Sequence, residues 1–191
     1  QQLLNTCKLR EDGFWYDVIV FAIDTGVRHD GELNRITPDE IDYGKKNMTF
    51  FRPKTGKWST VPLTNRALEV VKRRREVALK NEGNRFFPIS KSSLRHNWDK
   101  YIKLSGLNDE YTPYSTRHTF ITRLVEADVS PKAVQHLAGH KSIETTLQYY
   151  THSTNEVLEN AITKLEEYKK AKTKKAEVSS LIGHNSRKVL K

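Results

Sequence analysis

The sequence has one cysteine, Cys7, and no apolar stretch as long as a membrane span. A single thiol cannot build a disulfide framework or a cysteine-rich zinc site, which excludes disulfide-stabilised secreted domains and zinc fingers. The absence of about 18 consecutive apolar residues excludes a transmembrane helix. Residues 1–4 lack the charged and apolar regions of a signal peptide. We therefore expect a cytoplasmic protein that does not contact a membrane.

Several catalytic and ligand-binding motifs are also absent. The chain has no glycine-rich phosphate-binding loop and no serine nucleophile elbow. His136 and His140 are spaced like two metal ligands on one helix face, but Gly139 between them is a usual helix stop. The sequence therefore predicts no metal site and no cofactor.

Positive charge, in contrast, is abundant. The 191 residues include 33 Lys and Arg against 23 Asp and Glu, which gives a formal net charge of +10. Such a surplus predicts a polyanionic partner, most simply nucleic acid. The length suits one domain that can bury a core, and 36% of the residues are hydrophobic.

The residue patterns predict a mainly helical domain with a small antiparallel β-hairpin or sheet, an α+β fold. The apolar segment 16–25 is expected to be a buried helix that ends at Gly26. Segments 48–52 and 58–62 are rich in aromatic and β-branched residues and flank a turn that contains Gly56, which predicts a hairpin. Further helices are expected over residues 65–80, 92–104, 116–127, 131–138, 142–149 and 155–170.

The remaining polar residues suit phosphodiester chemistry. Two guanidinium groups can hold the non-bridging oxygens and stabilise a pentavalent phosphorus. A Lys or His can protonate the departing 5′ oxygen, and a Tyr hydroxyl can attack phosphorus and hold a covalent intermediate. The candidates for these roles are Arg28, Lys54, Arg117, His140 and the pair Tyr149 and Tyr150.

Over about residues 14–168 the chain resembles the catalytic domain of the tyrosine recombinases, the phage-integrase type of site-specific DNA recombinase. Four blocks carry the resemblance in the correct order: Thr25-Gly26-Val27-Arg28, Lys54-Thr55-Gly56, Arg117-His118-Thr119-Phe120, and Gly139-His140 followed by the tyrosine pair. The resemblance implies the fold of that catalytic domain, in agreement with the pattern of helices and hairpin.

The resemblance also implies a role for each matching residue. Arg28 and Arg117 would hold the scissile phosphate, and His140 would donate a hydrogen bond to it. Lys54 would protonate the 5′ oxygen from the hairpin turn, with Lys57 as the alternative.

Two positions depart from the family pattern. Three residues rather than the usual two separate Arg28 from Glu32. Glu32 is expected to orient the arginine. Tyr114 stands where the family has a histidine. A tyrosine can donate a hydrogen bond but is a poor acid at pH 7, so assistance by a general base is in doubt at this position. His118 is expected to have a structural role.

Either of two adjacent tyrosines fits the position of the nucleophile. Many relatives place it nine residues after the histidine of the third box, which is Tyr149, and others place it ten residues after, which is Tyr150. The order Tyr150-Thr151-His152 matches relatives in register, so Tyr150 is preferred and Tyr149 is the second choice. Further basic residues that could contact DNA phosphates are Lys57, Arg73, Arg74 and Arg95.

The organisation of the chain follows from the same comparison. The sequence starts without a methionine and its only methionine is Met48, which indicates a fragment of a longer chain. Family members carry a DNA-binding domain before the catalytic one, and we expect this upstream domain to be missing here. Residues 1–168 are expected to form the catalytic domain. Residues 169–191 would form a basic tail that is mobile or docks onto a neighbouring subunit.

The resemblance implies a site-specific DNA recombinase of the integrase or excisionase type. It would cleave and rejoin strands through a covalent 3′-phosphotyrosine without metal or ATP. The partner would be double-stranded DNA with specific recombination sites, bound by a homotetramer. The resemblance also implies that the protein comes from a bacterium, a phage or another mobile element and that it associates with the nucleoid. The alternatives are a resolvase or topoisomerase with the same chemistry, and a weak or inactive relative that only binds DNA.

Overall fold

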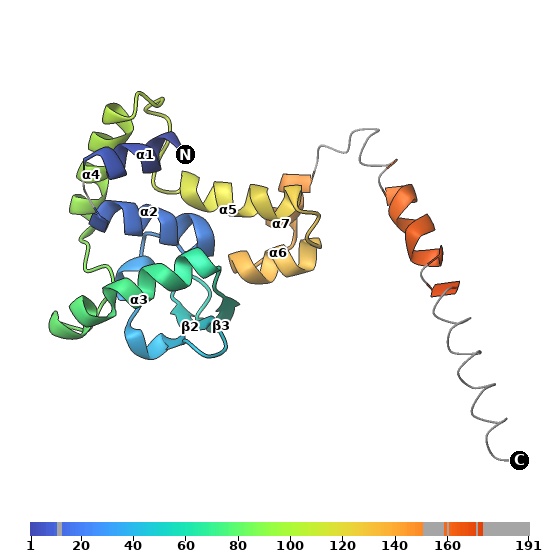
Figure 1. The fold of residues 1–191 in the computed structure, drawn as a ribbon, viewed down its shortest axis with the longest axis horizontal. Helices are drawn as coiled ribbons and strands as arrows, with labels where there is room; N and C mark the ends of the chain where they lie inside the picture. The colour runs from blue at the N-terminus through green and yellow to red at the C-terminus, as the bar shows by residue number, and fades with distance from the viewer. Residues whose placement is uncertain (11–12, 151–158, 160, 171, 174–191) are drawn as a thin grey trace, which may run out of the picture. The chain divides into compact units, whose positions relative to one another are not determined.

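The computed structural model describes residues 1–10, 13–150, 159, 161–170 and 172–173 (Figure 1). The chain divides into two units, residues 1–149 and residues 150–191. The first unit contains a small sheet and most of the helices, whereas residues 161–170 of the second unit are helical. The compact unit therefore ends at Tyr149, and residues 150–168, which the sequence analysis assigned to the catalytic domain, belong to the second unit.

Helix α2 (Gly13–Thr25) lies at the centre of the first unit (Figure 1). It contacts α1 (Gln2–Leu9), α3 (Asn65–Lys80) and α5 (Ser115–Glu126). A helix that is covered on several sides needs apolar residues on several faces, which explains the uninterrupted apolar run in this segment. The helix ends at Gly26, whose φ of +63° is a left-handed conformation that glycine adopts without strain. The predicted buried helix is confirmed.

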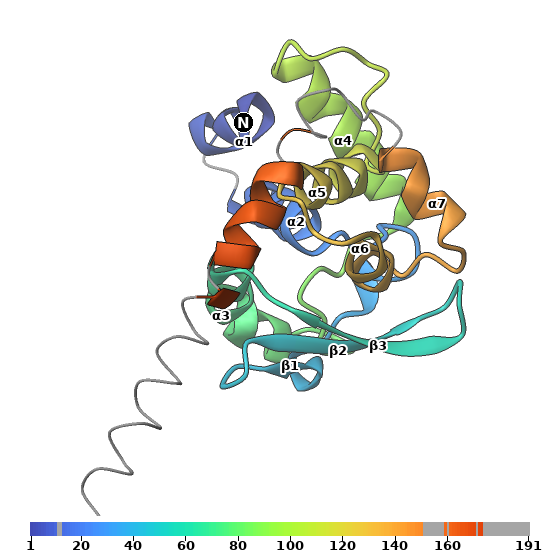
Figure 2. The same cartoon turned by 90° about the vertical axis from the view of Figure 1, so that its right-hand side faces the viewer.

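The sheet has three antiparallel strands in the order β1 (Ile41–Asp42), β2 (Asn47–Arg52) and β3 (Lys57–Pro62), which confirms the predicted hairpin (Figure 2). Arg52 pairs with Lys57 at the end of the ladder, and Gly56 in the turn has a φ of +65°. Alternation along β2 buries Met48, Phe50 and Arg52.

The sequence analysis predicted no helix over α1, whereas the other helices agree with the sequence patterns to within about two residues, the usual uncertainty of helix ends. They are α4 (Lys91–Leu104), α6 (Pro131–Ala138) and α7 (Glu144–Leu147), with the 3-10 turns η1 (Leu33–Arg35), η2 (Pro38–Glu40) and η3 (Gln148–Tyr150). Ser130 caps α6 as predicted and accepts from the backbone N–H of Ala133. The helix expected over residues 142–149 is shorter than predicted, because it tightens into η3. Of the last expected helix, residues 155–158 and 160 lie outside the described residues, and residues 161–170 are helical.

Candidate active site

The motif blocks meet around the C-terminal end of α6. Arg52 and Arg117 donate to the carbonyl oxygen of Ala138. Arg28 donates to the carbonyl oxygen of Gly139 at 3.1 Å. The last carbonyls of a helix have no partner within it and form the negative end of the helix dipole, so cationic donors stabilise them. Three guanidinium groups from three distant segments are thereby held together.

Arg28 follows the end of α2 and is fixed by Glu32. The guanidinium lies 2.6 Å from one carboxylate oxygen, and the backbone N–H of Arg28 donates to the other at 2.8 Å. The intervening turn contains Gly31 with a φ of +86°, and the N–H of Leu33 returns to the carbonyl of Arg28. The turn absorbs the additional residue noted in the sequence, so the pairing of Arg28 with the acid is retained.

Arg52 was not singled out from the sequence, although it is fully buried beside Glu32. Its guanidinium lies 3.3 Å from the Glu32 carboxylate and donates to the carbonyl of Leu137 at 2.8 Å. Burial lowers the pKa of Arg52 to about 10, an effect that Glu32 opposes and the charges of Arg117 and Arg28 increase. The signal in the sequence is the alternation of β2, which places an arginine at an inward position.

Arg117 lies in the first turn of α5 and has no exposed surface. It donates to the carbonyl of Gly26 at 2.6 Å in addition to its bond to α6. Burial lowers the pKa of its guanidinium, with a further contribution from Arg28, whereas Tyr114 and Glu32 oppose the shift. A phosphate can reach Arg117 only when the side chains that cover it move.

His140 follows the left-handed Gly139, and its Nδ1 lies 2.9 Å from the hydroxyl oxygen of Thr146. A Cβ at position 139 would lie 2.7 Å from Nε of Arg52, so only glycine fits beneath this arginine. Burial and then the charges of Arg117, Arg28 and Arg52 lower the pKa of His140 to about 4. His140 is therefore neutral at pH 7 and donates through one ring nitrogen.

Tyr149 extends from η3 into the same cluster. Its hydroxyl lies 2.6 Å from Nδ1 of His118, and its ring stacks on that of His140 with centroids 6.4 Å apart. The His118 ring also meets Tyr114 edge-on, with centroids 4.8 Å apart. Burial and then Tyr114 raise the pKa of Tyr149, whereas Arg117 lowers it, so the phenol stays protonated at pH 7.

The tyrosine pair is divided between the two units. The first unit ends with Tyr149, whose contacts with His118 and His140 place it in the cluster, and the second unit begins with Tyr150. The sequence register preferred Tyr150. Tyr149, the second choice, is the tyrosine whose contacts with the site histidines are described, so we develop the proposal below with Tyr149 as the nucleophile.

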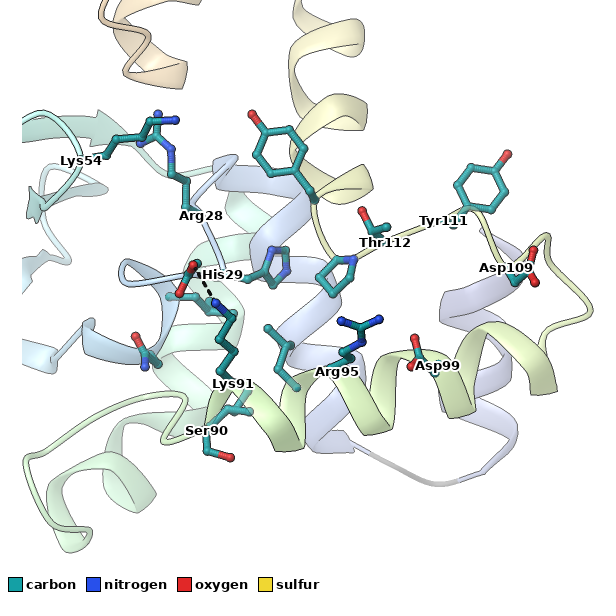
Figure 3. A pocket seen from close by; sticks show the side chains of 17 residues that line it. Arg28, His29, Lys54, Ser90, Lys91, Arg95, Asp99, Asp109, Tyr111 and Thr112 are labelled. Atoms are coloured by element: carbon teal, nitrogen blue, oxygen red, sulfur yellow. Dashed lines mark hydrogen bonds and ion pairs between the residues drawn. The ribbon is translucent and has the colours of Figure 1, made fainter.

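A cleft of about 680 Å³ continues from the cluster along the first turns of α4 (Figure 3). Arg28, Lys54 and Tyr114 line its end near the cluster, and Lys91 and Arg95 line the part along α4. The hairpin turn thus brings Lys54 to the cleft that Arg28 borders, as the motif blocks predict. Three aspartates, Asp30, Asp99 and Asp109, also line the cleft, and Lys91 pairs with Asp30. The basic side chains outnumber the acidic ones by one, so charge alone does not identify the cleft as the path of a polyanionic strand.

Two of the predicted DNA contacts form ion pairs inside the fold. Arg73 and Arg74 both pair with Asp17, a buried carboxylate on α2. Arg74 also donates to the carbonyl of Phe86 and lies over the ring of Phe14. Its side chain is only 12% exposed, so its charge serves packing between α2 and α3 rather than a surface contact. The side chain of Arg73 is 56% exposed, so part of it faces solvent while it pairs with Asp17.

Within the described residues, no group of three or more His, Cys, Asp or Glu side chains is placed to hold a metal ion. No helix in the described part of the chain is both long and apolar enough to cross a membrane.

Comparison of the sequence with protein families finds a match to the phage integrase family over residues 1–156. A tyrosine recombinase XerC from Syntrophus aciditrophicus is 28% identical over 159 residues, which cover 74% of this chain and 50% of the relative. A tyrosine recombinase XerA from Saccharolobus solfataricus is 28% identical over 173 residues, 91% of this chain and 56% of the relative. The chain thus spans about half the length of these curated relatives.

Solved structures share the fold at lower identity. The Tn1549 transposon integrase in complex with transposon right end DNA has a TM-score of 0.69 and 21% identity, covering 86% of this chain and 63% of that one. The catalytic domain of bacteriophage HP1 integrase has a TM-score of 0.63 and 19% identity, covering 85% of this chain and 88% of that one. The mainly helical fold with a small antiparallel sheet is therefore that of tyrosine recombinase catalytic domains.

Proposed function

This chain belongs to the phage integrase family, and from that membership we propose that it cleaves and rejoins DNA as the catalytic part of a site-specific recombinase. The observation that supports this most is the position of Tyr149, whose hydroxyl meets His118 and whose ring stacks on His140, beside the arginines at the end of α6. A nucleophile, neutral donors and fixed positive charge are the parts that phosphoryl transfer without a metal requires.

In the proposed reaction, Arg28 and Arg117 hold the non-bridging oxygens of the scissile phosphate. Neutral His140 donates a further hydrogen bond. The Tyr149 oxygen bonds to phosphorus, the bond to the 5′ oxygen breaks, and Lys54 protonates the departing oxygen. The product is a 3′-phosphotyrosine, which a 5′-hydroxyl from the same or a partner duplex reverses. The covalent bond conserves the energy of the broken one, so no nucleotide cofactor is needed.

The partner of this reaction is double-stranded DNA. The XerH recombinase bound to difH substrate and the Tn1549 integrase bound to transposon DNA have the same fold, at 20% and 21% identity. Recombination joins two duplexes, so we propose that the protein acts as a homotetramer on two specific sites. The cleft along α4 would guide the strand that leads to the scissile phosphate.

The test is formation of a covalent adduct. The protein that carries this chain is incubated with a pool of nicked duplexes of randomised sequence, and DNA that stays attached in SDS is recovered and sequenced. We expect recovery of a defined sequence, with the attached nucleotide mapped by mass spectrometry to a tyrosine of the 149–150 pair. A protein that binds DNA but never yields an adduct would contradict the proposed activity.

Replacement of Arg95 by glutamine tests whether DNA follows the cleft. If Arg95 neutralises one phosphate, its loss lowers DNA affinity and reduces the slope of log K against log salt by about 1. The control is Arg66→Gln, which removes an exposed arginine that pairs with Asp24 away from the cleft. Fluorescence anisotropy at several salt concentrations measures the DNA affinity and the salt slope of each variant. If Arg95→Gln and Arg66→Gln gave equal slopes of log K against log salt, the DNA would not follow the cleft.

A further inference from the structure

The attacking tyrosine needs a base, and the family's usual residue for this position is replaced here by Tyr114. The pKa of Tyr149 is raised by burial, so its proton must be removed as the oxygen attacks. Tyr114 cannot remove it, because a neutral phenol accepts protons poorly. Some other group that touches the Tyr149 oxygen has to replace the missing histidine.

His118 is placed to do so. It lies one helical turn after Tyr114 on α5, so both side chains project from the same face of the helix. Its Nδ1 lies 2.6 Å from the Tyr149 oxygen, within the range required of a general base. The edge-on contact with Tyr114 and the tilted contact with the Tyr149 ring fix the imidazole plane.

The charges around His118 favour the neutral base. Burial and then the charge of Arg117 lower the pKa of His118, so it is unprotonated at pH 7. The other titratable groups that face it are Tyr114 on the same helix, Tyr149 on η3 and His140 after α6. No carboxylate is among them, so no ion pair with these groups favours the imidazolium before the reaction begins.

We propose that His118 is the general base of this chain and takes over the role of the histidine that Tyr114 replaces. The inference rests on the proposed function, with Tyr149 as nucleophile. The Tyr149 hydroxyl proton passes to Nδ1 of His118 as the oxygen bonds to phosphorus, and Lys54 gives a proton to the departing 5′ oxygen. In the rejoining step His118 returns its proton to the departing Tyr149 oxygen, and Lys54 takes the proton of the attacking 5′-hydroxyl.

The first test is a pair of substitutions at position 118. His118→Ala removes the base, and His118→Asn keeps an oxygen near the position of Nδ1 that accepts from Tyr149 but cannot take its proton. Both variants should form the adduct about 100-fold more slowly, the lower end of a general base's contribution. The matched control is His136→Ala, an exposed histidine on α6, which should react at the rate of the wild type. A wild-type rate in His118→Asn would show that the residue only positions Tyr149.

The second test separates the base from the acid. In a nicked duplex with sulfur in place of the bridging 5′ oxygen, the leaving group needs no proton, because a thiolate is a far weaker base than an alkoxide. The substitution should restore the adduct rate of Lys54→Ala. It should leave the defect of His118→Asn unchanged. Restoration of both variants would overturn the assignment of His118.

The third test is the pH dependence. Because the neutral imidazole is the active form and its pKa lies below 6.5, the wild-type adduct rate should be flat from about pH 7 to 9. Without the base, the rate should rise about tenfold per pH unit over this range, since the phenol pKa is above 10. A flat profile in His118→Ala would contradict the proposal.

Substitution of Tyr149 distinguishes a wrong role for His118 from a wrong choice of nucleophile. If Tyr149→Phe still forms the adduct, the choice of nucleophile fails. If Tyr149→Phe is inactive while both variants at position 118 react normally, the nucleophile stands and only the role of His118 is wrong.

Discussion

Tyr149→Phe is expected to abolish the covalent adduct completely and to leave DNA affinity almost unchanged. The substitution removes one oxygen, the atom that lies 2.6 Å from His118, and keeps the ring that stacks on His140. A nucleophile has no substitute in the chemical step, whereas phosphate contacts supply most of the affinity. Adduct formation on the selected duplex and anisotropy on the same duplex measure the two properties separately.

Tyr150→Phe is the matched control, because it removes the same oxygen one residue later. We expect this variant to form the adduct. The opposite result, an adduct with Tyr149→Phe and none with Tyr150→Phe, would restore the assignment that the sequence register preferred. In that case the hydrogen bond between Tyr149 and His118 would belong to the protein before DNA binds.

Arg52→Met is expected to lower the free energy of unfolding by about 3–5 kcal/mol, the cost of breaking a buried ion pair by removing one partner. Methionine fills a similar volume but leaves the carbonyls of Leu137 and Ala138 without this donor. Among the described residues, Arg28 is then the one charged partner left to Glu32. Urea unfolding followed by circular dichroism measures the difference.

The control for Arg52 is Arg66→Met. That variant breaks a pair in which the arginine is 42% exposed and the Asp24 carboxylate keeps the Thr64 hydroxyl as a donor, so it should cost clearly less than Arg52→Met. Arg52→Lys keeps the charge but loses the planar fork that reaches Glu32 and two carbonyls together. Its stability should fall between those of the wild type and Arg52→Met. Equal stability of Arg52→Met and Arg66→Met would mean that the buried arginine contributes nothing to the fold.

The fold followed from local patterns. The hairpin was predictable because β-branched residues and Gly56 act over a few positions, and α6 because Ser130 and Pro131 start a helix and Gly139 ends it. The boundary at Tyr149 was not predictable, since the polar amphipathic pattern that follows continues without a break and only tertiary contacts divide it.

The site was predictable where the residues form motifs and not where packing decides. The blocks singled out Arg28, Lys54, Arg117 and His140, and the structure brings Arg28, Arg117 and His140 together around the end of α6. The contact between His118 and Tyr149 joins positions 31 residues apart, and no local signal encodes it. The pairing of Arg74 with Asp17 is likewise a tertiary contact. The sequence does contain one signal for it, because Asp17 lies within an apolar helix and a buried carboxylate needs a cationic partner.

The carbonyl end of α6 has a consequence for how the protein opens. Arg28, Arg52 and Arg117 come from three segments of the chain, and together they donate to three consecutive carbonyls, those of Leu137, Ala138 and Gly139. Fraying of this one helix end would release all three arginines from these carbonyls together, so we expect them to behave as one cooperative unit of local unfolding. If Arg28 and Arg117 hold the scissile phosphate as proposed, the site would lose both contacts together rather than one at a time.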